Sequence, residues 1–161
     1  RTYNYRFSSL QHVSGACQLF RRACYEDIGG YVAIKGGGID SVAVMTARMK
    51  GWRTQTFTDM VLEHHRPMGS GSGAGKIKAY FQFGQKAYRL GWHPLWQVFR
   101  SLYQMTKPPL LVAGLALLAG YLSSWFRGIE IPISRELMEF QRRDQMRQLK
   151  AFLAAGRRNT T

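Results

Sequence analysis

The spacing of apolar and polar positions predicts a mixed first part of the chain. Apolar residues recur at helical spacing over residues 39–49, and Gly51 follows as a C-terminal cap. A single helical turn is predicted over residues 24–28. Three further segments fit short strands: residues 12–21, 54–57 and 61–65. Residues 1–68 are therefore predicted to form an α/β unit.

A different pattern begins after a Gly/Ser-rich stretch, residues 69–75, which predicts a flexible loop. Residues 76–161 are helical in character. Between Trp92 and Tyr103, aromatic and apolar residues recur at i, i+3, i+4 and i+7 with cations beside them. This pattern fits a helix facing a core and a helix lying in a bilayer interface equally well.

Residues 110–126 form an uncharged, apolar run that bears on membrane association. As one helix the run would be about 26 Å long at 1.5 Å per residue, shorter than the hydrocarbon core of roughly 30 Å. The tail beyond it is rich in arginine, and such clusters stay on the cytoplasmic side. We therefore expect a re-entrant, interfacial or protein-buried segment, because a single crossing would separate this tail from the first part of the chain.

The charge balance indicates an anionic partner. The chain has 23 Lys and Arg against 9 Asp and Glu, a formal net charge of +14, together with many aromatic residues. Such a surface attracts a nucleotide diphosphate, anionic lipid or a nucleic-acid backbone. No RNA- or DNA-binding motif is present, so nucleic acid is the least favoured partner.

Asp40 is the strongest candidate for chemistry. It follows three consecutive glycines, residues 36–38, and stands at the start of the predicted helix. An aspartate there is often only a helix cap. A glycine-rich approach also lets a substrate come close, and a lone carboxylate could then take the proton from a sugar hydroxyl.

A set of short motifs resembles the family 2 glycosyltransferases, inverting enzymes of the GT-A fold. The motif residues occur in the family's order: Ser14, Gly15, Ala16, Arg21 or Arg22, Gly29, Gly30, Tyr31, Asp40, Arg48, Gly51 and Trp52. The resemblance covers about residues 12–66. It implies an α/β fold, the C-terminal acceptor-side part of a GT-A nucleotide-diphospho-sugar transferase, followed by a mostly α-helical extension. Asp40 then takes the role of general base, although Ile39 stands where the family's acidic pair has Glu.

The resemblance also implies binding residues. We expect acceptor or donor contacts from Ser14, Gly15, Ala16, Arg21, Gly37, Gly38, Arg66 and Lys76. His64 and His65 are the expected contributors to a site for Mg²⁺ or Mn²⁺ in the full-length enzyme. Lys76 belongs to a glycine-rich run that superficially resembles a P-loop, but Ile77 replaces the required Ser or Thr.

Taken together, the motifs predict a hexosyltransferase fragment that uses a nucleotide-diphosphate sugar and a glycan or lipid-linked acceptor. The family's DxD metal motif does not occur in the sequence, so we expect an N-terminally truncated chain that is inactive alone. The expected location is the cytoplasmic face of a bacterial inner membrane, peripheral or re-entrant, in contact with anionic lipid. The alternatives are a non-catalytic basic membrane-surface module and, less favoured, a nucleic-acid-binding protein.

Overall fold

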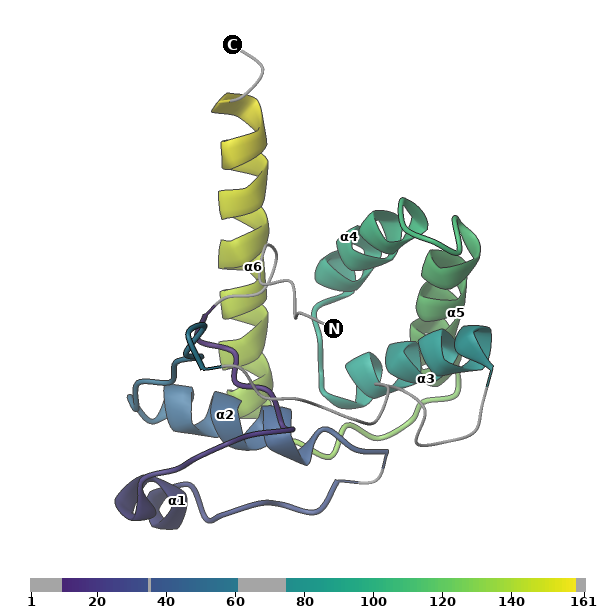
Figure 1. The fold of residues 1–161 in the computed structure, drawn as a ribbon. Coiled ribbons are helices and arrows are strands. Elements are labelled where there is room, and N and C mark those ends of the chain that lie inside the picture. Colours follow the sequence, from purple (N-terminus) through teal and green to yellow (C-terminus); the bar gives the residue numbers. More distant parts are fainter. Residues whose placement is uncertain (1–9, 35, 61–74, 159–161) are drawn as a thin grey trace. The chain divides into compact units, whose positions relative to one another are not determined.

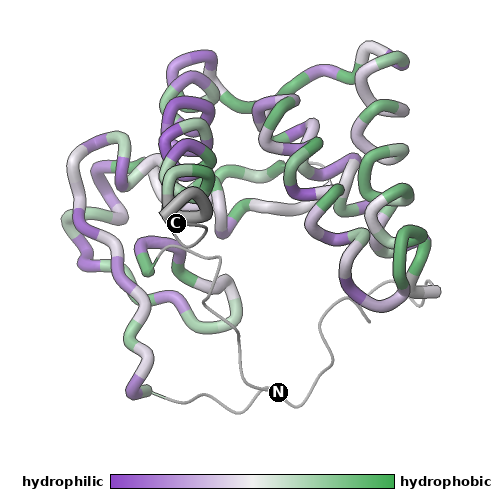
Figure 2. Tube along the Cα trace, turned by 90° about the horizontal axis from the view of Figure 1, so that it is seen from above, coloured by the Kyte–Doolittle hydropathy of each residue, from purple (hydrophilic) through white to green (hydrophobic). Residues whose placement is uncertain are grey.

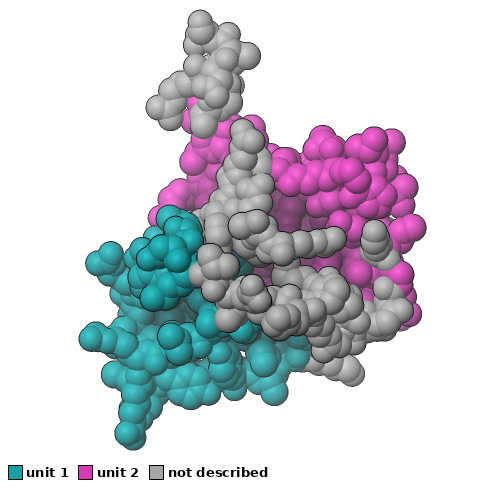
Figure 3. Space-filling model, viewed as in Figure 1, with its two compact units in different colours: residues 1–70 teal, residues 71–161 magenta. Residues whose placement is uncertain are grey.

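The computed structural model describes residues 10–34, 36–60 and 75–158, and every regular element in these ranges is a helix (Figure 1). The chain divides into two compact units, Arg1–Ser70 and Gly71–Thr161, called unit 1 and unit 2 below (Figure 3). The predicted α/β class is wrong for the described residues, and with it the acceptor-side GT-A architecture.

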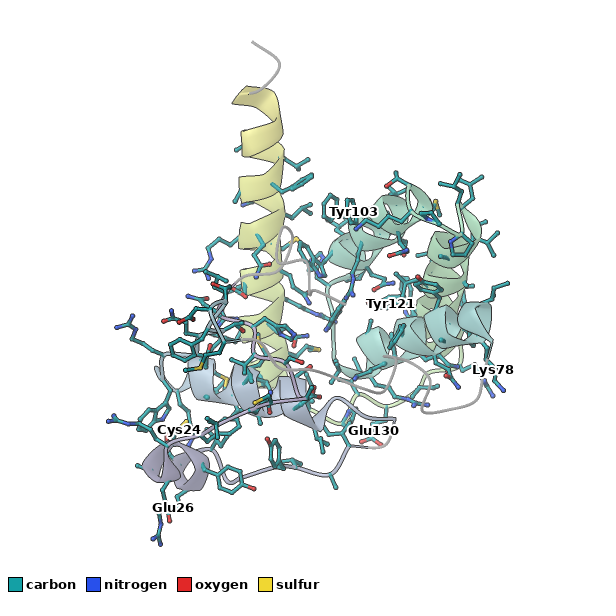
Figure 4. The ribbon with its side chains drawn as sticks, in the orientation of Figure 1. Cys24, Glu26, Lys78, Tyr103, Tyr121 and Glu130 are labelled. Atoms are coloured by element: carbon teal, nitrogen blue, oxygen red, sulfur yellow. The ribbon has the colours of Figure 1, made fainter. Side chains whose placement is uncertain are left out.

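Unit 1 contains two helices at positions that the sequence predicts, α1 (Arg22–Asp27) and α2 (Ile39–Met49). Side chains from both helices share one small hydrophobic core. The core consists of Cys24, Ile28, Ala43 and Ala47, with Phe20 and Trp52 packed against it. Cys24, labelled in Figure 4, is 6% exposed and joins α1 to this core.

The end of α2 shows why Gly51 and Trp52 follow the helix. The Gly51 N–H donates to the Arg48 carbonyl, and the Trp52 N–H donates to the Ala47 carbonyl, which is the Schellman pattern. This pattern requires a left-handed residue at position 51, and Gly51 has φ +89°. The reversal brings the Trp52 indole N–H within 2.8 Å of Asp27 Oδ2, so this glycine–tryptophan pair has a structural role.

The segments predicted as strands are extended but form no ladder. Residues 12–21 bend at a turn in which the Cys17 N–H donates to the Ser14 carbonyl, and Leu19 is 95% exposed. Residues 10–12 run beside residues 54–56. The hydroxyls of Thr54 and Thr56 donate to the backbone carbonyls of Gln11 and His12, which could otherwise accept from a neighbouring strand. The strand predictions for residues 12–21 and 54–57 are therefore wrong, and residues 61–65 lie outside the described part of the chain.

Unit 2 consists of helices throughout its described residues. They are α3 (Lys76–Arg89), α4 (Pro94–Met105), α5 (Val112–Phe126) and α6 (Arg135–Arg158). Two glycines let α3 and α5 approach backbone to backbone. A Cβ on Gly84 would lie 2.8 Å from the Tyr121 backbone nitrogen, and a Cβ on Gly120 would lie 2.8 Å from the Phe81 carbonyl carbon.

The contact between α4 and α5 is polar at its centre. Gln97 and Ser101 of α4 are completely buried. Gln97 Nε2 lies 3.3 Å from Ser101 Oγ and 3.4 Å from the Leu117 carbonyl, whereas Gln97 Oε1 is buried without a hydrogen-bond partner among the described residues. Tyr121 completes the packing, since its hydroxyl donates to the Trp92 carbonyl at 2.8 Å (Figure 4).

Helix α6 docks on the turn between α3 and α4 through side chains that bind the turn's backbone. Gln141 Nε2 donates to the Leu90 carbonyl at 2.7 Å, and Arg142 Nε donates to the Gly91 carbonyl at 2.8 Å. The Gln145 side-chain oxygen accepts from the backbone N–H of His93 at 2.9 Å. These bonds give α6 a buried polar face and fix Arg142 beside the turn.

The outer surface of unit 2 carries many apolar side chains. At least two-fifths of each of these residues is exposed: Ile77, Phe83, Leu95, Val98, Leu102, Leu110, Leu111, Val112, Leu115, Trp125 and Phe126. In the helix leading to the C-terminus, hydrophilic and hydrophobic residues instead alternate (Figure 2). Among the helices of the described ranges, none combines the length and the apolar character needed to cross a bilayer.

Candidate functional site

Asp40 stands in the first turn of α2, at the end of the glycine run that the sequence analysis singled out. Gly36, Gly37 and Gly38 have φ of 96°, 82° and 104°, a left-handed path that residues with a side chain rarely follow. Gly38 is the N-cap, and its carbonyl accepts the first helical hydrogen bond from Val42. The glycines are thus needed to bring the chain into the helix at this angle.

The side chain of Asp40 lies against Gly15. A Cβ on Gly15 would be 2.8 Å from both the Cβ and the Cγ of Asp40, and closer still to its Oδ2. A side chain at position 15 would therefore force Asp40 or the turn around residue 15 to move. Two separately predicted site elements, the Ser14–Gly15–Ala16 turn and the acid at the helix start, therefore meet in space.

Gln18 fixes this arrangement, and the sequence analysis did not identify it. Its Nε2 donates to the Val13 carbonyl at 3.0 Å and lies 3.4 Å from the Asp40 carbonyl. Its Oε1 accepts from the Tyr31 hydroxyl at 2.9 Å. One signal was available: Gln18 is a polar residue within a stretch assigned to a buried strand, where an unpaired amide would be costly.

Three aromatic rings gather beside Gln18. Phe20, Tyr25 and Tyr31 contact one another pairwise, with centroids 5.7 to 6.0 Å apart and the planes steeply inclined. Tyr25 is 39% exposed and Tyr31 is 44% exposed. Gly30 allows the cluster, because a Cβ there would stand 3.2 Å from the Tyr25 ring. The exposed parts of the two tyrosines could contact a ligand, and Tyr31 is linked to the backbone of Asp40 through Gln18.

The carboxylate of Asp40 has the properties of a proton acceptor. It is half-buried, and within the described residues it accepts no hydrogen bond and forms no ion pair. A hydroxyl group brought to this carboxylate could therefore transfer its proton to it.

The other predicted binding residues are distributed as follows. Ser14, Ala16, Gly37 and Gly38 adjoin the Asp40–Gly15 contact, whereas the exposed Arg21 is the N-cap residue of α1. Lys76 begins α3 in unit 2. His64, His65 and Arg66 lie outside the described residues. In the described ranges there is no group of three or more His, Cys, Asp or Glu residues that could hold a metal ion.

Arg48, one of the motif residues, has a structural contact. Its guanidinium donates to Gln11 Oε1 at 2.8 Å and so ties α2 to the extended segment before the Gly15 turn. Comparisons with family models, with curated proteins and with solved structures each found no match. The resemblance to glycosyltransferases therefore rests on the motif residues of the sequence alone.

Proposed function

We propose that this chain supplies the general base of an inverting glycosyltransferase of the family 2 type. The observation that carries the proposal is the contact with Gly15 of an Asp40 carboxylate that pairs with no other described residue, since these residues belong to separate motifs of that family. The reaction would move a sugar, as a hexosyl group, from a nucleotide-diphosphate donor to a glycan or lipid-linked acceptor.

In this reaction Asp40 takes the proton from the acceptor hydroxyl while the hydroxyl oxygen attacks the anomeric carbon. The bond from that carbon to the diphosphate oxygen breaks on the opposite face, which inverts the configuration. Tyr25 and Tyr31 would orient the acceptor through their exposed rings and hydroxyls. Mg²⁺ or Mn²⁺ would neutralise the leaving diphosphate, and His64 or His65 is this chain's proposed contribution to holding it. The donor site itself would come from residues beyond these 161.

The test replaces Asp40 by Asn in the whole gene product. Membranes from expressing cells are incubated with a panel of UDP- and GDP-sugars, and release of nucleoside diphosphate and transfer into glycan and lipid fractions are measured. Loss of a general base lowers the rate by about 10²–10⁴-fold, while donor binding should be unchanged. Glu26→Gln, on exposed α1, is the matched loss of a carboxylate. Transfer retained in Asp40→Asn would refute the proposal.

A second candidate function is a membrane-surface module, and the burial pattern of unit 2 favours it. The helix contacts contain glycines and buried polar side chains beside a few apolar residues such as Ala113 and Leu117, while many large apolar residues are exposed. Helices that associate in lipid use small and polar residues in this way, because lipid drives no apolar burial between them. We propose that the apolar surface of unit 2 lies in the interface of an anionic bilayer, on the cytoplasmic face of a bacterial inner membrane.

The tip between α4 and α5 is the best place to test this attachment. Leu110 and Leu111 are 63% and 62% exposed, and Lys107 precedes them. Burying a leucine contributes about 1.5–3 kcal/mol, so Leu110→Ser with Leu111→Ser should weaken vesicle binding at least tenfold in co-sedimentation. Leu19→Ser, at a residue 95% exposed in unit 1, is the matched control. Equal binding by the tip variant and the unmodified chain would exclude this mode of attachment.

A further inference from the structure

A cavity of about 530 Å³ opens on unit 2 between the start of α4 and the middle of α6. It is lined by His93, Arg142, Arg143, Met146, Arg147 and Lys150. Four of these six side chains are cationic. Neither the glycosyl-transfer proposal nor the apolar surface uses them.

Two of the lining side chains are held in place before any ligand arrives. Arg142 is fixed through its Nε bond to the Gly91 carbonyl, and its four remaining guanidinium N–H donors bond to no described residue. His93 is anchored by its backbone N–H to Gln145, and its Nδ1 accepts from the Leu95 N–H at 3.1 Å. The neutral ring therefore carries its proton on Nε2 and offers one donor.

The charge balance at the cavity favours an anion. Arg147 pairs with Asp144, which is 7% exposed and also accepts from Gln148 at 2.9 Å. Arg143 and Lys150 are exposed and form no ion pair within the described residues. Burial, and next the charge of Arg142, lower the pKa of His93, so positive charge at neutral pH comes from the arginines and the lysine.

We propose that this cavity binds a phosphate or diphosphate group. Arg142 supplies a planar, pre-positioned fork that matches phosphate oxygens. Arg143 and Lys150 add charge without first breaking an ion pair, and Met146 with the aliphatic stems of the cations forms a wall for the ester substituent. The group could belong to a soluble diphosphate or to the headgroup of a lipid in the bilayer proposed above. Only the lipid source depends on the proposed membrane attachment.

The test uses the full chain and two probes. Sodium pyrophosphate is titrated by calorimetry, and co-sedimentation is measured with phosphatidylcholine vesicles with and without phosphatidic acid. The cavity variant is Arg143→Gln with Lys150→Gln, two exposed residues whose replacement should leave folding intact, as circular dichroism would check. The control is Arg135→Gln with Lys86→Gln, which removes the same charge elsewhere in unit 2; Arg135 pairs with Glu139 on an exposed face of α6.

We expect the cavity variant to bind pyrophosphate at least tenfold more weakly, and the control less than twofold more weakly. If the cavity variant but not the control also loses binding to phosphatidic acid vesicles, the lipid headgroup is a source of the phosphate. If the cavity variant loses binding to pyrophosphate alone, the ligand is a soluble diphosphate. Equal losses in both variants would indicate nonspecific attraction to a basic surface and would overturn the proposal. Absence of binding to both probes would overturn it as well. Neither result depends on glycosyl transfer, which Asp40→Asn tests separately.

Discussion

Replacement of Gly15 by Ala tests the geometry on which the candidate site depends. Gly15 does not have a positive φ, so alanine is allowed there by the backbone and the added methyl acts only through its contacts. That methyl would stand 2.8 Å from Cβ and Cγ of Asp40. Carbon atoms prefer about 3.5–4.0 Å, so Asp40 and the first turn of α2, or the turn around Gly15, must move by roughly 1 Å, because a Cβ moves only with its backbone. A displacement of about 1 Å at a reacting group can lower a rate by about 10²-fold.

Two measurements separate the contact from the chemistry. Glycosyl transfer by the whole gene product should fall by about 10²-fold in Gly15→Ala, with little change in KM for the donor. Thermal unfolding of a double-mutant cycle with Asp40→Gly should show a coupling of about 0.5–2 kcal/mol, because the second change removes the atoms that the methyl strikes. Additive effects on unfolding would show that the two residues do not touch. Coupling without an effect on transfer would preserve the contact and refute the catalytic role.

Two further predictions concern stability. The pKa of Asp27 is lowered first by the hydrogen bond from Trp52 and next by the one from Lys50. The ionised Asp27 therefore stabilises unit 1 at pH values above the unfolded pKa of about 3.9. This stabilisation is lost as the pH falls through the lower pKa of the folded state. The melting temperature should therefore fall less between pH 6 and pH 3 in Asp27→Asn than in the unmodified chain. An equal fall in both proteins would contradict the stabilising role of ionised Asp27. Gly120→Ala should lower the unfolding free energy by about 1–2 kcal/mol, since its methyl meets the α3 backbone. Gly75→Ala is the matched control, because nothing lies within 4 Å of a Cβ at that position. Equal melting temperatures of the Gly120→Ala and Gly75→Ala variants would exclude the close approach of α3 and α5.

The helices of unit 1 could be predicted from sequence because their signals are local. Residues 39–49 combine helical periodicity with Gly51 beyond the end, and α2 has these bounds. The predicted strands failed because a strand depends on a partner elsewhere in the chain. The hydroxyls of Thr54 and Thr56 bind the carbonyls of residues 11 and 12, and no periodicity in the segment itself reveals that competition.

The sequence identified the main candidate residues of the site but not the hydrogen bonds that hold them together. Asp40 and Gly15 were identified from motifs, and the structure brings them into contact. Gln18 was missed because its importance comes from three bonds made by one amide, to groups that are distant in sequence. The cavity on α6 was missed for a similar reason, since it includes His93 from the turn before α4.

The way unit 2 is packed connects its fold to its proposed place at a membrane. An interface of leucines between α4 and α5 would lose its driving force if lipid replaced water outside. The contacts present include close and polar ones: the buried Gln97 lies beside Ser101 where α4 meets α5, and Gly120 of α5 lies against the Phe81 carbonyl of α3. Close backbone packing and buried hydrogen bonds persist in both surroundings, and separating the helices in lipid would leave these polar groups without partners. Unit 2 can therefore keep one fold while its apolar surface passes from water into the bilayer interface, which a peripheral or re-entrant attachment requires.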